Sequence, residues 1–332
     1  MYDPLVLSAL AVLFLTQAPT PPPADNPEVL AQAEKLDALM KVPEPDWSQV
    51  TKSLGQSRAF IAEQIAADKL KTAADFGRAA RLVDDPRGWS QHRMLQHELT
   101  LCGLLLGGSN GTPSFRQTWD SLMTSLGRKQ RFGFFKRPKP GTKIYVPYNV
   151  DPNPPTAMVR LVFEKPKEAK AKSVAAKDLA EMEAIRKVDQ EDREKNWKPE
   201  TMEAVRLRDA QRLARTKELL RRGRLVTGRD LHNASLILQH SDNADDYAAA
   251  HELALAACLL GDTEAKWLVS RTYDRFLLHL GHPQRLGTQY WPDTPEGLGP
   301  MDDRWVNDTI RTTLEAATLA KTREIAKSYA AS

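Results

Sequence analysis

The sequence predicts a mainly α-helical fold of two tandem related multi-helix units, with a small β-hairpin insertion between them. The first observation is internal similarity, because residues 97–133 align with residues 251–287 without a gap. The second is that apolar residues recur at helical spacing through most of both segments. The third is that a glycine follows several of these runs, where a left-handed helix end favours glycine. These glycines are Gly107, Gly127, Gly261 and Gly281.

Helical periodicity defines five helices in the first copy and four in the second. Those of the first copy are expected at 27–39, 47–67, 72–83, 91–106 and 114–126, and those of the second at 203–222, 230–239, 245–260 and 264–280. Asp230 is expected to cap its helix, and Thr263 followed by Glu264 suits the start of the next. Residues 306–330 predict one or two further helices.

The segment between the copies has a different pattern. Residues 142–148 and 158–163 alternate or are β-branched, with a turn-rich stretch at 149–155, and this predicts a hairpin. Residues 165–172 are basic and expected to be solvated. Residues 178–222 are dense in Glu, Lys, Arg and Ala, which predicts a long exposed helix that connects the halves.

These observations divide the chain into five parts. They are a signal peptide or short anchor at 1–18, a proline-rich spacer at 19–27, a divergent first helical unit at 28–135, a hairpin and charged connector at 136–200, and a second helical unit at 201–332. The apolar run in 1–18 is short for a membrane span but suits a signal peptide. We therefore expect export to a periplasmic or extracellular location. The alternative is an uncleaved anchor, which would be the only part of the chain in contact with a membrane.

Composition limits the choice of partners. Hydrophobic residues make up 41% of the chain, charged residues 27%, and the net charge is +4. A surplus this small does not favour nucleic-acid binding. The cysteines are Cys102 and Cys258, each in an apolar helix. We expect two buried thiols, with a disulfide between the copies as the alternative.

The residues that both copies share are most simply explained by the fold, since both copies must fold alike. They include His97 and His251, each followed by Glu-Leu, and Asp120 and Asp274 in the longer helix, with Gln-Arg-x-Gly after it. Leu101 and Leu255 stand where a second metal-binding histidine would be needed, which excludes the H-E-x-x-H helix of a zinc protease.

The residues that differ between the copies indicate where chemistry could lie. The second copy has Gln239-His240, Arg275 and Thr288-Gln289, where the first has Asp84-Asp85, Ser121 and Phe134-Phe135. Polar groups of this kind are costly to bury unless they are hydrogen-bonded. They therefore form either a structural network or the lining of a pocket.

These motifs resemble a bacterial helical domain of unknown function over residues 210–325. The resemblance rests on a Gln-His pair at 239–240, an Asp-Arg pair at 274–275, a G-x-P-Q-x-x-G-T-Q loop at 281–289 and an N-x-x-T-R motif that is looser here, at 307–311. Leu286 replaces the aromatic residue usual in the loop. The resemblance implies no reaction or cofactor, and the first copy would be a divergent relative.

Residue types suggest roles within this set. His240 is the candidate general acid or base, because it titrates near neutral pH, and Asp274 is the candidate that orients its ring. The candidates for ligand binding are Gln239, Arg275, Gln284, Arg285, Thr288, Gln289 and Arg311. The arginines suit a carboxylate or phosphate. The alternative is a buried network in which Asp274 pairs with Arg271 or Arg275.

No metal or cofactor is expected. Histidine and acidic residues are dense from 240 to 282, but no pair has zinc-site spacing supported by ligands elsewhere, and the acidic run at 242–246 departs from a calcium loop. The sequence therefore predicts an exported bacterial protein whose second unit binds or hydrolyses a small polar or anionic ligand. The alternative is a non-catalytic helical scaffold for a protein partner.

Overall fold

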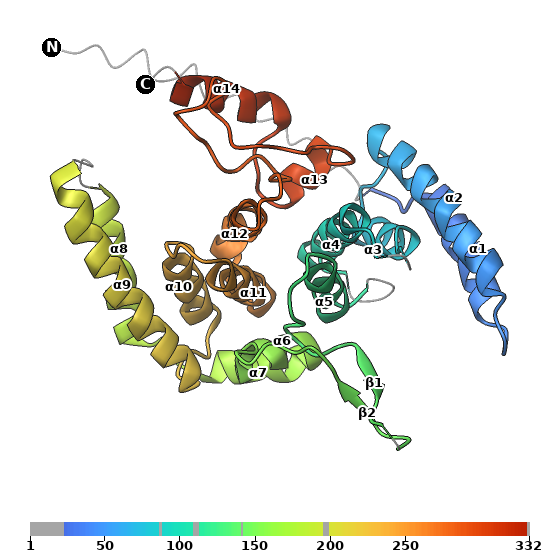
Figure 1. Ribbon diagram of the computed structural model, residues 1–332, viewed down its shortest axis with the longest axis horizontal. Helices are drawn as coiled ribbons and strands as arrows, with labels where there is room; N and C mark the ends of the chain where they lie inside the picture. The colour runs from blue at the N-terminus through green and yellow to red at the C-terminus, as the bar shows by residue number, and fades with distance from the viewer. Residues whose placement is uncertain (1–22, 86–87, 109–112, 141, 195–198, 331–332) are drawn as a thin grey trace, which may run out of the picture.

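The computed structural model describes residues 23–85, 88–108, 113–140, 142–194 and 199–330, and these are mainly α-helical (Figure 1). The predicted fold class is confirmed, since the described residues form helices with one small two-stranded antiparallel sheet. The predicted signal segment at 1–18 lies outside the described residues. Among the described helices, none has the length and apolar character to cross a membrane.

The first half of the chain holds helices α1 to α7 and the sheet. Their bounds are α1 Pro27–Met40, α2 Trp47–Ala66, α3 Ala73–Leu82, α4 Ser90–Leu105, α5 Phe115–Ser125, β1 Lys136–Pro138, β2 Tyr145–Pro147, α6 Ala157–Glu164 and α7 Pro166–Ala175. The first five helices agree closely with the helices that periodicity predicts.

The second half holds the remaining helices. Their bounds are α8 Ala180–Glu194, α9 Pro199–Arg221, α10 Gly228–Leu238, α11 Ala244–Leu260, a 3-10 turn at Thr263–Ala265, α12 Lys266–His279, α13 Asp308–Thr313 and α14 Leu319–Ala330. Gly107, Gly127, Gly261 and Gly281 all have positive φ at helix ends, as predicted.

The two halves follow the same order of helices, and equivalent contacts show where each begins. Asp75 in α3 accepts a hydrogen bond from the backbone N–H of Asn26, just before α1 (2.7 Å). Asp230 in α10 accepts one from the N–H of Leu179, just before α8 (2.8 Å). In Figure 1, α1 and α2 flank the centre on the right, and α8 and α9 flank it on the left. The charged helices therefore hold, in the second half, the place that α1 and α2 hold in the first.

One prediction about the charged segment and one about the start of α10 are wrong. The charged segment forms two helices rather than one, and α9 begins at Pro199, which lacks the N–H that a continuing helix needs. The two helices run antiparallel, because Arg193 at the end of α8 pairs with Asp209 in the middle of α9, whereas Glu181 at the start of α8 pairs with Arg215, closer to the end of α9. At the start of α10, Thr227 is the N-cap and Asp230 closes the capping box, so Asp230 is not the cap itself.

The hairpin also differs from its prediction. Strand β2 lies inside the predicted strand at 142–148, but it pairs with β1 upstream, with Arg137 opposite Val146. The predicted partner at 158–163 lies in α6, where Thr156 caps the helix and Met158, Val159 and Val162 are buried on one face. Spacing of one, three and four residues matches a helix better than a strand.

The core extends through both halves, among α3, α4 and α5 and among α10, α11 and α12, and α4 and α11 contact each other at the centre of Figure 1. Leu99 and Leu101 of α4 and Leu253 and Leu255 of α11 are buried there. Cys102 and Cys258 are free thiols, and Cys102 is buried as expected, whereas Cys258 is half-buried. This arrangement places the residues that the two sequence copies share at the boundary between the halves.

Candidate functional site

The shared residues form a closed polar centre between the halves. Glu98 of the first half forms an ion pair with Arg285 of the second at 2.8 Å, and Glu252 of the second pairs with Arg131 of the first at 2.7 Å. All four side chains are buried. Shared residues thus hold the two halves together, as a structural role requires. Arg285, a predicted ligand-binding residue, is bound to Glu98 instead.

Asp274 stabilises a loop rather than orienting His240. Its carboxylate accepts hydrogen bonds from the backbone N–H groups of Arg285, Leu286 and Thr288, at 2.8 to 3.0 Å, and from the Thr288 hydroxyl at 2.8 Å. Burial raises the pKa of Asp274, and these hydrogen bonds oppose that shift. The expected ring-orienting role is therefore wrong, and so is the expected pairing with Arg271 or Arg275.

Gln284 and Arg311 complete the support of the same loop. The Gln284 amide accepts from the Gln289 N–H at 2.9 Å and donates to the Gln289 and Gly299 carbonyls. Arg311 is fully buried and donates to the Leu286 carbonyl at 2.7 Å. Four predicted site residues, Asp274, Gln284, Arg285 and Arg311, therefore lie in a buried network that shapes the loop.

His240 faces α8. Its Nδ1 lies 3.2 Å from a carboxylate oxygen of the buried Asp189, and its Nε2 accepts a hydrogen bond from the Nε of Arg193 at 3.1 Å. Burial lowers the pKa of His240, partly opposed by Asp189. The ring is therefore neutral near pH 7, and its second nitrogen is occupied by an arginine.

Sequence reasoning missed Asp189 and Arg193, because residues 178–222 were expected to form an exposed connecting helix. Asp189 and Asp192 of α8 are buried, and Arg212 of α9 approaches them at 3.4 and 2.8 Å. Arg208 adds a two-fold contact to Asp192, which holds the pKa of that carboxyl well below its usual range. Acidic residues at 189 and 192 lie on one face of the helix, and this spacing was the available signal.

Arg275 lines an open hollow beside His240. Its Nε donates to the Gln289 side chain at 2.9 Å, and its Nη1 donates to the Gln239 carbonyl at 2.6 Å. No carboxylate among the described residues forms an ion pair with it. The hollow has a volume of about 260 Å³. Its lining residues are Tyr247, Arg275, Leu278, His279, Gln289 and Trp291.

We call this the Arg275 hollow. The first half lacks the charged and amide side chains at the positions equivalent to Arg275 and Gln289. Ser121 stands opposite Arg275 in the alignment of the copies, and Phe135 stands opposite Gln289. The structure thus brings together Gln239, Arg275 and Gln289 from the predicted set. Burial lowers the pKa of Arg275, and the nearby cations Arg271 and Arg193 add to the effect.

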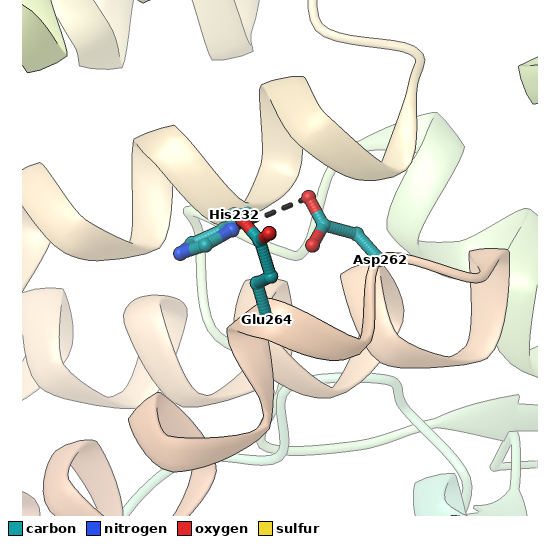
Figure 2. A group of neighbouring side chains, drawn as sticks. All are labelled: His232, Asp262 and Glu264. Carbon is teal, nitrogen blue, oxygen red and sulfur yellow. Dashed lines mark hydrogen bonds and ion pairs between the residues drawn. The ribbon is translucent and has the colours of Figure 1, made fainter. Parts of the chain in front are cut away.

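A group with metal-ligand chemistry lies elsewhere in the second half. His232 of α10 approaches Asp262 at 3.2 Å, with Glu264 beside them (Figure 2). Arg229 already pairs with Glu264 at 2.8 Å and lies 3.7 Å from Asp262. Because the guanidinium supplies the positive charge that these carboxylates need, we treat the group as an ion-pair cluster.

Comparison with known proteins yields no relative, since no family model, curated protein or solved structure matches the chain.

Proposed function

We propose that this protein binds a small anionic ligand in the Arg275 hollow. The observation that supports this most is that the partly buried Arg275 has neutral hydrogen-bond partners and no ion pair among the described residues. A cation removed from water without a counter-charge is costly. A carboxylate or phosphate in the hollow would supply that charge, and the arginine fork matches the geometry of both.

The neighbours of Arg275 favour a defined orientation of its guanidinium. The Gln239 carbonyl and the Gln289 side chain occupy Nη1 and Nε, while Nη2 makes no hydrogen bond to described residues. The free Nη2 is thus the group offered to a ligand. Leu278 and Trp291, which is 42% exposed, give the hollow an apolar wall. A small carboxylate or phosphate with an apolar part would fit this lining.

His240 fits this proposal as a positioning residue. It follows Gln239 directly, and its contacts with Asp189 and Arg193 fix the end of α10, whose Gln239 carbonyl holds Arg275. A general base needs a free nitrogen lone pair to take a proton. Because Arg193 occupies that lone pair, binding is a better-supported proposal than hydrolysis.

The test measures ligand-induced stabilisation with phosphate, acetate and benzoate as probes. We expect at least one anion to raise the melting temperature of the wild type, since a ligand stabilises the state that it binds. Arg275→Gln should abolish the rise. Arg271→Gln is the matched control, because Arg271 lies one turn earlier in α12 and stacks on Trp267 instead of lining the hollow. An equal rise in Arg275→Gln would refute the proposal.

The second candidate is a non-catalytic scaffold for a protein partner. It is favoured by the burial of Asp274, Gln284, Arg285 and Arg311. Their hydrogen bonds are made within the protein, so these side chains are not open to a ligand. Under this alternative, Arg275 serves only to tie α12 to the Gln289 loop. Arg275→Gln would then lower the melting temperature, and no anion would raise that of the wild type.

We also propose that this is an exported bacterial protein, on the basis of the apolar run in residues 1–18. The proposal is tested by fractionating bacterial cells that express the full chain or a variant lacking residues 1–18. We expect the full chain outside the cytoplasm and the shortened chain within it. Equal distribution of the two would contradict export.

A further inference from the structure

A second and larger cavity lies apart from the Arg275 hollow, and the two share no lining residue. It has a volume of about 890 Å³ and lies between the C-terminal end of α9, helix α11 and residues 152–157 before and at the start of α6. We call it the α9 cavity. Its accessible apolar surface comes from Leu220, Ala249, Pro152 and Pro154, and Leu238 and Leu253 lie almost fully buried beneath it. Its size is within the range of small-molecule sites.

In the first half, hydrogen bonds close the equivalent contact, which lies between α2 and α13. At the C-terminal end of α2, the Asp68 carboxylate accepts hydrogen bonds from Asn307 at 3.0 Å and from Thr309 at 2.5 Å. Asn307 also donates to the Ile65 carbonyl at 2.8 Å. Asn307 and Thr309 stand at the start of α13, so these bonds fasten α2 to α13.

The second half lacks the side chains that form these hydrogen bonds in the first half. Gly223 ends α9 with φ +64°, as Asp68 ends α2 with φ 53°. Thr156 caps α6 as Asn307 caps α13, and Met158 stands where Thr309 stands. A glycine offers no acceptor and a methionine no hydroxyl. A Cβ at Gly223 would meet no atom within 4 Å, so α9 and α6 stay apart there.

The charges around the α9 cavity are paired, with one exception. At its rim Lys217 pairs with Asp246 at 2.7 Å, and deeper in the cavity Arg131 pairs with Glu252. Asp245 contacts Arg128. Arg221, one turn after Lys217 on α9, is exposed and forms no ion pair among the described residues. The lining thus combines an apolar floor with a single available cation.

We propose that the α9 cavity binds an aliphatic carboxylate, with the chain over Leu220 and the prolines at 152 and 154 and the carboxylate at Arg221. Burial of the chain supplies the affinity, because transfer of apolar surface from water is favourable. The ion pair with Arg221 fixes the direction in which the chain lies. This site is independent of the Arg275 hollow.

The test uses the full chain and the fluorescent probe 11-(dansylamino)undecanoic acid. We expect saturable binding with a blue-shifted emission, displaced by dodecanoic acid and at least tenfold less well by dodecanol. Arg221→Gln should weaken binding about tenfold. Arg222→Gln is the matched control, since Arg222 pairs with Glu218 and does not line the cavity, and it should bind as the wild type does.

A second test introduces into the second half the side chains that hold α2 to α13 in the first half. Gly223→Asp combined with Met158→Thr should close the cavity and reduce probe binding at least tenfold, with the melting temperature reported as evidence that the variant is folded. Arg275→Gln should bind the probe unchanged. The proposal is overturned if the wild type does not bind the probe, or if Arg221→Gln and the folded double variant both bind as the wild type does.

Discussion

His97 and His251 face each other at the centre of the molecule, with their Nε2 atoms 3.1 Å apart. Nδ1 of His251 lies 3.0 Å from the Val269 carbonyl, which can only accept, so that nitrogen carries the hydrogen. In the neutral ring, Nε2 of His251 is then the acceptor, and Nε2–H of His97 is the donor. The two equivalent histidines thus carry their hydrogen on different nitrogens, Nε2 in His97 and Nδ1 in His251.

Acid should destabilise the protein through this pair. Burial lowers the pKa of His251 to about 4 and that of His97 well below its ordinary value of 6.5. Below pH 6.5 the unfolded chain takes up protons that the folded protein refuses, so stability falls with pH until about pH 4. For His251 alone this loss approaches roughly 3 kcal/mol. Urea unfolding from pH 7.5 to 4.5 should show it, and His251→Gln should flatten the dependence. An unchanged slope in that variant would contradict the assignment.

The reciprocal ion pairs predict that both are important for stability. Glu98→Ala leaves Arg285 buried with only Asp302 as a counter-charge, at 3.6 Å, and Glu252→Ala leaves Arg131 with only Asp151, at 2.9 Å. Each single change should lower the free energy of unfolding by up to about 3–5 kcal/mol. Glu98→Ala should cost more than Glu252→Ala, because the carboxylate left to Arg285 is farther away than the one left to Arg131. The double variant Glu98→Leu with Arg285→Met should cost less than Glu98→Ala alone, because it removes both charges. Urea denaturation measures all three, and a double variant at least as unstable as the single one would count against this account.

Asp274→Asn should act on stability. The amide retains one acceptor oxygen but turns an NH2 group toward backbone N–H donors, and each unsatisfied buried group costs about 1–3 kcal/mol. Asp120→Asn is the matched variant in the first half, where the carboxylate accepts from Arg131, Phe132 and Phe134. Similar losses by thermal and urea unfolding are expected. A fully stable Asp274→Asn would return this residue to the list of functional candidates.

Two glycines with similar backbone angles should respond differently to alanine. Gly287 has φ +71° and Gly223 has φ +64°, so either change costs about 1 kcal/mol in backbone strain. At Gly287 the new Cβ would also lie 2.8 Å from Thr322 and 3.0 Å from Met301, whereas at Gly223 it meets nothing within 4 Å. Gly287→Ala should therefore be the less stable in thermal unfolding, and equal melting temperatures would contradict the crowding.

Periodicity alone was enough to predict most helices, because a buried helical stripe leaves a local record in the sequence. It failed at α6, where Met158, Val159 and Val162 are apolar and β-branched in a short run that suits a strand as well. The internal duplication stays a prediction about origin. The structure adds that equivalent residues make equivalent contacts.

The candidate site was predictable only in part. The comparison of copies grouped Gln239, Arg275 and Gln289, which do meet. It could not separate them from Asp274 and Gln284, since the same residue types serve a ligand or a loop equally well. Asp189 was missed because its partner His240 is distant in the chain, and a charged helix gives little sign of which carboxylates it buries.

The crossed pairing of Glu98 with Arg285 and of Glu252 with Arg131 has a consequence for each half in isolation. Every half carries both members of the pair, one on α4 or α11 and one in the loop after α5 or α12. A single half is therefore self-complementary, and two copies of it would meet through an isologous contact with twofold symmetry. A fragment made of the second half alone should accordingly form a homodimer, in which one gene segment supplies both sides of an interface that is internal in the full chain.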